Sequence, residues 1–373
     1  MAQRRRRSLV KLAAAMLPLS TAFPASAVES EGGVSVSRIL PETVYTERRR
    51  GALRLNFDLI LENRSDKDAH LTYLDLRLYD KKGRILMRRI MDGNGLPGAI
   101  AMLPDRVIPA GDDLHLFNPF PDLHATGAVA RVVLRGYYEG GSFEASFQPS
   151  RFDGPVMKRP PLGEGAYVFT GNDLFAHHRR VSLTSAPAQA LNMQRITQRF
   201  ALDLTAIDPV SGELATGDYS ELSNWPAYGR AVYAPTDGVV AHMRGDMPEG
   251  VMTGAGRVMK PDAYDSYGDN ASLGNYVILR IDEAYLVLAH LKAGSLKVEP
   301  GQRIKAGDYI GALGLSGDTA YPHLHMQLQD GSDILHARPL PLVFDCVQLG
   351  AEGARREMSQ AGLDSGDFVS PCK

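Results

Sequence analysis

The sequence predicts an all-β protein built from two folded units, and three observations lead to this prediction. Residues 35–152 alternate hydrophobic and polar side chains with the period of two that half-buried strands require. Residues 149–165 are rich in proline and glycine, as linkers between folded units often are. After residue 165, short strand-like runs continue, and helical periodicity is weak except in the C-terminal tail. A chain of 373 residues that is 44% hydrophobic is long enough to bury two cores.

Residues 1–27 have the pattern of a signal peptide. A basic head at Arg4 to Arg7 precedes an apolar stretch from Leu9 to Phe23, and Ala25-Ser26-Ala27 has the small-x-small form that signal peptidase cuts. The apolar stretch falls short of the ~20 residues that span a bilayer. We therefore expect an exported protein, periplasmic or extracellular, that begins at Val28 and has no transmembrane anchor after cleavage.

Residues 28–152 are expected to form a β-sandwich of immunoglobulin-like type. From residue 53 to residue 61 every second position is hydrophobic, with Arg54, Asn56 and Asp58 between them, which is typical of half-buried strand. Several short runs of this kind, separated by turn sequences such as Glu139-Gly140-Gly141, predict two packed antiparallel sheets. The histidines of this unit are scattered and are interpreted as surface or rim residues: His70, His115 and His124.

The sequence further divides into a linker at residues 153–165, a second β unit at residues 166–345 and a tail at residues 346–373. The only two cysteines, Cys346 and Cys372, lie in the tail. Two cysteines in an oxidising compartment most often pair, and a bridge here would add roughly 3 kcal/mol of stability through chain entropy. The alternative is a pair of free thiols.

Seven of the ten histidines lie in the second unit, which makes it the candidate for chemistry. His323-Leu324-His325 is the most informative pair, because alternate residues on a strand point to the same face. Imidazole is a common zinc ligand, so two adjacent rings indicate a possible metal site. A formal net charge of −2 argues against a dedicated nucleic-acid binder, which would carry a basic excess. The seven are His177, His178, His242, His290, His323, His325 and His336.

The motifs around these histidines resemble those of the M23 (lysostaphin-like) zinc peptidases. In order, the chain carries Leu288-Ala289-His290-Leu291, the glycine-containing run at residues 311–317, and Pro322-His323-Leu324-His325. Upstream, Phe200-Ala201-Leu202-Asp203-Leu204 is similar to the strand that supplies the family's aspartate ligand. The resemblance covers residues 165–345 and implies an antiparallel β-sheet domain that hydrolyses peptide bonds.

The resemblance implies a role for four of these residues. Asp203 and His325 would bind zinc, while His290 and His323 would face the water and the scissile carbonyl. His323 would act as general base or orienting group, and His290 would stabilise the oxyanion. The implied substrate is cell-wall peptidoglycan, either its stem peptides or its cross-links.

One position departs from the family pattern. The family usually has a histidine ligand four residues before the aspartate, and this chain has Arg199 there. A guanidinium stays protonated and cannot bind a metal, so we expect it to pair with the Asp203 carboxylate instead. The resemblance to an M23-like subgroup with a His-Arg-Arg stretch favours His178 as the replacement ligand, over its neighbour His177. His242 and His336 are expected to be peripheral.

Two alternatives to a zinc endopeptidase follow from the same residues. In the first, the metal is lost and the domain is a catalytically silent module that binds or regulates cell-wall hydrolases. In the second, the protein binds a surface through its first domain. The retention of Asp203, His290, His323 and His325 together favours the enzyme.

Overall fold

The computed structural model describes residues 26–120, 122–174 and 176–372. Within these ranges the chain forms strands β1 to β27, four short 3-10 helices and one α-helix, α1 (Ala186–Ala190), so the predicted all-β class is confirmed. The predicted signal peptide lies almost wholly outside the described residues, and its last two residues, Ser26 and Ala27, begin β1 (Ser26–Glu31). No described helix is long and apolar enough to cross a membrane.

The N-terminal unit is a β-sandwich. Its larger sheet has the order β1-β11-β10-β6-β7, with β8 paired to β6, and the facing strands form two sheets of three, β2-β5-β9 and β12-β3-β4. The immunoglobulin-like topology stays a prediction. The remaining bounds are β2 (Val34–Leu40), β3 (Tyr45–Arg49), β4 (Ala52–Leu55), β5 (Asp58–Asn63), β6 (Ala69–Tyr79), β7 (Ile85–Met91), β8 (Val107–Ile108), β9 (Asp113–Phe117), β10 (Arg131–Tyr138), β11 (Gly141–Phe147) and β12 (Ser150–Arg151).

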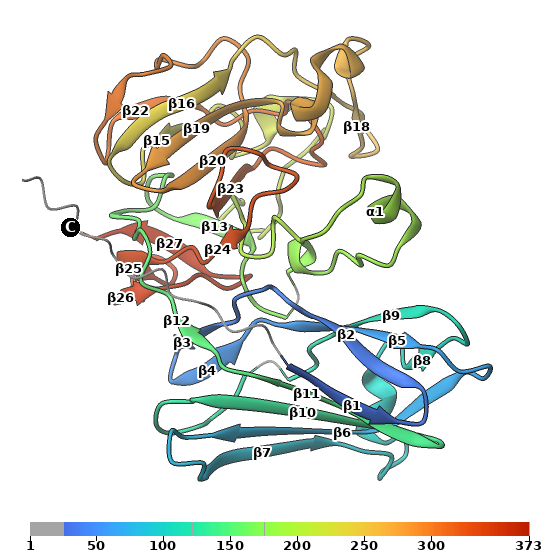
Figure 1. Ribbon diagram of the computed structural model, residues 1–373. Helices are drawn as coiled ribbons and strands as arrows, with labels where there is room; N and C mark the ends of the chain where they lie inside the picture. The colour runs from blue at the N-terminus through green and yellow to red at the C-terminus, as the bar shows by residue number, and fades with distance from the viewer. Residues whose placement is uncertain (1–25, 121, 175, 373) are drawn as a thin grey trace, which may run out of the picture.

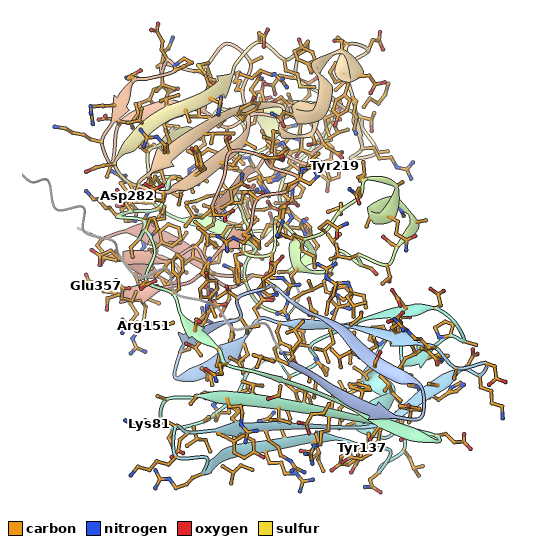
Figure 2. All side chains as sticks on the ribbon, in the orientation of Figure 1. Lys81, Tyr137, Arg151, Tyr219, Asp282 and Glu357 are labelled. Atoms are coloured by element: carbon orange, nitrogen blue, oxygen red, sulfur yellow. A yellow bond between two sulfur atoms is a disulfide. The ribbon has the colours of Figure 1, made fainter. Side chains whose placement is uncertain are left out.

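Strand β5 is buried on both faces, which the alternating pattern does not predict. Leu59 and Leu61 point into the sandwich core, but Asp58 and Ile60 are also buried, with 0% and 4% of their surfaces exposed. The reason is that the sheet β2-β5-β9 faces the C-terminal unit. Lys81 and Tyr137 mark the side of the sandwich away from that unit (Figure 2). His115 on β9 is only 4% exposed, so its interpretation as a surface or rim residue is wrong.

The C-terminal unit is built on an 11-stranded sheet with the order β21-β16-β19-β20-β23-β14-β13-β27-β25-β26, and β24 pairs with β23. Small hairpins, β15-β22 and β17-β18, lie outside this sheet. Figure 1 shows the unit above the sandwich. The bounds are β13 (Ala166–Thr170), β14 (Leu202–Thr205), β15 (Ala231–Tyr233), β16 (Gly238–Arg244), β17 (Val251–Met252), β18 (Val258–Met259), β19 (Asn275–Ile281), β20 (Ala284–Leu291), β21 (Arg303–Ile304), β22 (Tyr309–Ala312), β23 (Leu324–Gln329), β24 (Pro339–Leu340), β25 (Phe344–Leu349), β26 (Arg356–Ala361) and β27 (Phe368–Pro371).

The linker and the tail both pack onto this unit. Met157 and Leu162 from the linker are fully buried in its core. The tail forms strands rather than the helix that its periodicity suggested, and β27 pairs with β13. Cys346 and Cys372 form a disulfide, which joins β25 to the end of β27.

A long connection between β13 and β14 lies between the two units (Figure 1). It carries a 3-10 helix, η2 (His177–Arg179), and then α1. Val181, Leu183, Met193 and Ile196 of this connection pack against Leu40, Ile60 and Phe117 of the sandwich. The sandwich therefore supports the segment that precedes Asp203.

Candidate metal centre

Strands β14 and β23 bring the predicted aspartate and histidine pair together. The two strands are antiparallel neighbours, and Asp203 stands directly opposite His325 in their register. His323 and His325 share one face because they are two residues apart. Asp203 and His325 are 1% and 2% exposed. The strand pairing therefore brings Asp203 and His325 together although they are far apart in the sequence.

His290 reaches the same place from the end of β20, the other neighbour of β23. Its backbone is left-handed, with φ of 62°, which is uncommon for a residue other than glycine. The glycine-containing run at residues 311–317 packs closely against the end of β20. A Cβ on Gly314 would lie 2.5 Å from backbone atoms of Lys292, so only glycine fits there. Gly314 N–H donates to the His290 carbonyl at 3.0 Å. The His290 and His323 rings lie with centroids 4.7 Å apart.

His178 completes the group from the long connection. Its Nε2 lies 2.9 Å from Asp203 Oδ1, and His325 Nδ1 lies 3.1 Å from the same oxygen. His323 Nε2 is 3.4 Å from that oxygen as well. His177 is more exposed and lies 3.4 Å from the second carboxylate oxygen, Oδ2. Asp203 is therefore surrounded by imidazoles from two separate stretches, residues 177–178 and residues 323–325.

The outer nitrogen of each ring is held by an oxygen acceptor. His178 Nδ1 lies 3.0 Å from Gln198 Oε1, and His325 Nε2 lies 2.8 Å from Gln327 Oε1. Gln327 Nε2 donates to Gln329 Oε1, whose own amide donates to the Gly331 carbonyl. Because a backbone carbonyl can only accept, this chain orients both amides and makes His325 Nε2 the protonated nitrogen.

The donor set fits a divalent metal ion. With their outer nitrogens protonated, His178 Nε2 and His325 Nδ1 present lone pairs to a carboxylate oxygen that itself has only lone pairs. Such a cluster is repulsive unless a cation or an additional proton lies among the donors. Two imidazoles and one carboxylate, each ring held by a further hydrogen bond, are the ligands of open zinc sites.

Burial and charge set the protonation states of these groups. Burial lowers the pKa of His178 to about 4 and holds the pKa of His290 well below its ordinary value. Burial opposes the charged form of His323 too, but the Asp203 carboxylate outweighs it and raises that pKa. Burial alone would raise the pKa of Asp203, yet the imidazoles of His323 and His178 hold it well below its ordinary value. At neutral pH His178 is therefore neutral and Asp203 is an anion.

The centre opens into a cavity of ≈680 Å³. Besides the histidines, its lining includes residues 256–258 of the β17-β18 hairpin and residues 318–321. Phe169 is partly exposed, and its ring centroid lies 4.6 Å from that of Tyr321. The Tyr321 ring centroid in turn lies 4.7 Å from that of His323. A peptide segment could therefore approach the rings from solvent.

Arg199 does not pair with Asp203, which contradicts our expectation. Its guanidinium points the other way, into the sandwich, where it donates to Asp58 Oδ2 at 2.5 Å and to Asn56 Oδ1 at 2.8 Å. Arg199 is 1% exposed. The position that holds a ligand in the family pattern is thus used here for contact between the two units.

The other histidines lie outside the group. His242 is exposed on β16, and His336 pairs with Asp333 at the surface, with Nδ1 3.0 Å from Oδ2. The sequence motifs do not single out Gln198 and Gln327, although both hold ring nitrogens of the group. Gln327 continues the alternation of His323 and His325 on one strand face, a signal that could have revealed it.

Comparison with known proteins identifies part of the chain. Residues 225–336 match the family model described as Peptidase family M23, a range that includes His290, His323 and His325. The peptidoglycan DD-endopeptidase ShyA of Vibrio cholerae serotype O1 is 29% identical over 87 residues, which are 23% of this chain and 19% of ShyA. The chain therefore matches about a fifth of the length of this curated relative.

The solved structures that this chain matches include those of two peptidases. The catalytic domain of lysostaphin from Staphylococcus simulans is 21% identical, with a TM-score of 0.22, and the match covers 30% of this chain and 68% of that one. A zinc containing peptidase from Vibrio cholerae is 15% identical, with a TM-score of 0.24, and the match covers 80% of this chain and 83% of that one. Residues 225–336 of this chain are therefore similar to peptidase family M23.

Proposed function

We propose that this protein is a zinc-dependent endopeptidase that cleaves peptide bonds of cell-wall peptidoglycan. The observation that carries the proposal is the convergence of His178 Nε2 and His325 Nδ1 on Asp203 Oδ1, at 2.9 and 3.1 Å. These three residues would hold the ion. The substrate class is supported by the family match and by ShyA, a relative named as a peptidoglycan endopeptidase.

When bound at such a site, zinc polarises a carbonyl and makes water acidic enough to attack it near neutral pH. The protein's own contribution begins with orientation. Gln198 and Gln327 keep the lone pairs of the two ligand rings directed at Asp203, so the donors are arranged before a cation arrives.

His290 and His323 are proposed as the groups that move protons and hold charge. His290 Nδ1 donates to the Ser316 carbonyl at 2.9 Å, and His323 Nδ1 donates to the Tyr321 carbonyl at 2.9 Å. In each neutral ring the other nitrogen, Nε2, is then an acceptor. One ring can take a proton from the attacking water, and a protonated ring becomes a donor to the oxyanion. The resemblance assigns the first role to His323 and the second to His290.

Export is part of the proposal, because peptidoglycan lies outside the cytoplasmic membrane and residues 1–27 have a signal-peptide pattern. The N-terminal sandwich and the second unit are proposed as separate domains joined by residues 153–165.

Metal analysis of the purified protein, combined with a peptidoglycan digestion assay, tests this function. We expect about one zinc per chain and release of soluble muropeptides. His323→Ala should keep the metal and lower turnover by roughly 10²–10⁴-fold, because one proton acceptor is removed. His325→Ala should lose both metal and turnover.

His242→Ala is the matched control, since it removes an exposed histidine from the same sheet and should change neither property. A folded wild-type protein that takes up no zinc and digests no peptidoglycan would contradict the proposal and favour the silent module. A deletion of residues 28–155 that removes all cell-wall binding would favour a surface-binding role of the first domain.

A further inference from the structure

We propose that Asp58 of the N-terminal sandwich is a positioning residue for the metal centre of the C-terminal unit. This inference rests on the proposed function, because it concerns the site that would hold zinc. It assigns the sandwich a role in building the centre: docking of the sandwich places the ligand His178.

The first step is that the connection carrying His178 packs on the sandwich. Leu183 and Ile196 of this connection are buried against Leu40 and Ile60 in one apolar cluster. Leu183 N–H donates to His115 Nδ1 at 3.0 Å. Around them, Arg38 donates to the Gln194 carbonyl at 2.5 Å, Arg195 pairs with Glu42 at 2.7 Å, and the Arg180 guanidinium lies 4.8 Å from the centre of the Phe117 ring.

The second step is that Asp58 is the charged centre of this contact. Its side chain is 0% exposed and faces Arg199, 1% exposed, at 2.5 Å. Arg179 lies 4.0 Å from the other carboxylate oxygen, and His115 Nε2 lies 3.5 Å from Oδ2. Asn118 N–H donates to Asp58 Oδ1 at 3.0 Å. One carboxylate of the sandwich thus faces two buried arginines of the C-terminal unit.

The third step is that both arginines adjoin groups of the metal centre. Arg179 directly follows His178, the proposed ligand, in η2. Arg199 directly follows Gln198, whose Oε1 lies 3.0 Å from His178 Nδ1. The two guanidiniums are held on the sandwich side, while His178 faces Asp203 and Gln198 contacts His178. Holding Arg179 in place therefore positions the proposed ligand His178, and holding Arg199 in place positions its hydrogen-bond partner Gln198.

The consequence is a link between docking and metal affinity. Removing the Asp58 charge takes away the carboxylate that Arg199 contacts and leaves Arg179 with only the weaker attraction of Glu47. A buried guanidinium that loses its counterion is driven toward water. Metal ligands tolerate displacements of only about 0.2 Å, so a shift of η2 or of Gln198 weakens the site. A carboxylate that only stabilised the interface would lower the melting temperature and leave the affinity of the folded protein unchanged.

A matched control exists in the same interface. Asp364 is 7% exposed and, like Asp58, pairs with two arginines of the opposite unit, with Arg49 at 2.9 Å and with Arg54 at 2.5 Å. It lies in the tail, between β26 and β27, and neither arginine adjoins a proposed ligand. Asp364→Asn therefore removes a buried carboxylate from the same interface without changing the His178 or Gln198 segments, while Arg49 keeps Glu47 and Arg54 keeps Asp122 as partners.

The experiment measures zinc dissociation constants of the full-length chain by competition with a chromophoric chelator. It compares wild type, Asp58→Asn and Asp364→Asn at a temperature where far-ultraviolet circular dichroism shows each variant folded. We expect Asp58→Asn to weaken zinc binding at least tenfold, and Asp364→Asn to stay within twofold of wild type. Arg179→Met is the second test variant, since it keeps the Asp58 and Arg199 pair and releases only η2, and it should also weaken binding.

Unchanged affinity in Asp58→Asn, or in Arg179→Met should Asp58→Asn not fold, would overturn the inference. Equal weakening in Asp364→Asn would overturn it as well, because any loosening of the interface would then suffice. These outcomes differ from failure of the proposed function, in which the wild-type protein itself binds no zinc.

Discussion

At the scale of single residues, the feature that defines this centre is the control of imidazole tautomers. A histidine binds a metal through a nitrogen that carries no proton, so something must hold the proton on the other nitrogen. Here Gln198 and Gln327 do this for His178 and His325, and backbone carbonyls of Ser316 and Tyr321 do it for His290 and His323. The four rings therefore present the nitrogens that the proposed chemistry needs.

Replacing Gln327 tests this control. In Gln327→Leu, the buried His325 Nε2–H has no acceptor, and the ring can adopt the other tautomer, which places a proton on Nδ1. We expect zinc affinity to fall roughly 10- to 100-fold, the usual effect of losing an outer hydrogen-bond partner of a ligand. Competition with a chelator measures the affinity.

Gln348→Leu, on β25, is a control with the same chemical change in the same sheet. Affinity equal to wild type in Gln327→Leu would mean that the glutamine chain does not set the tautomer of His325.

At the scale of elements, the centre depends on strand register. Asp203 and His325 are opposite each other on β14 and β23, and a slip of one residue would turn one side chain to the other face of the sheet. The register is held by buried neighbours on both strands, since every residue of β14 and of β23 is buried. The disulfide acts further along the same sheet, where it ties β25 to the chain beyond β27.

Removing the disulfide should change stability without changing the centre. The Cys346→Ser, Cys372→Ser double variant opens a loop with a sequence separation of 26. We expect its free energy of unfolding to fall by roughly 3 kcal/mol, because the unfolded chain regains entropy. Urea unfolding followed by circular dichroism measures this. Zinc affinity of the folded variant should match wild type, and a parallel loss of affinity would show that the tail also positions the centre.

At the scale of the whole molecule, the two units share a buried, charged interface. Apolar contacts of the sandwich with residues 181–196 surround the Asp58 and Arg199 pair. Breaking one partner of a buried ion pair costs about 3–5 kcal/mol, since the other charge remains in a poor solvent. The interface is thus a large part of what holds the units in one arrangement.

This ion pair gives stability a defined pH dependence. Burial alone would raise the pKa of Asp58, but the Arg199 guanidinium and its neighbours outweigh burial and hold that pKa below its ordinary value of 3.8. A carboxylate with a lowered folded-state pKa stabilises the protein above the unfolded-state pKa and loses this effect as pH falls through the folded-state pKa.

We therefore expect the free energy of unfolding of wild type to exceed that of Asp58→Asn by about 3–5 kcal/mol between about pH 5 and 7. The difference should shrink as pH falls below 3.8. Urea titrations of both proteins across this range measure it. A difference that stays constant down to pH values where both unfold would show that Asp58 keeps its ordinary pKa.

Local sequence patterns were sufficient to predict most of the strands and the His323 and His325 pair of the centre. Alternation of hydrophobic residues predicts strands because side chains on a strand alternate between faces, and it also places His323 and His325 side by side. The same logic fails for Asp58 and His115. A strand pattern shows which residues share a face, but it cannot show that a second unit covers the face opposite the core.

The sequence alone determined the all-β class and the motifs that residues 225–336 share with peptidase family M23. Only the tertiary structure decided where Arg199 points and how His178 comes to Asp203 Oδ1, 25 residues away along the chain. Both depend on the connection between β13 and β14 lying on the sandwich. The physical reason is that a buried charge goes to its counterion wherever folding places it, and Arg199 finds that counterion in Asp58.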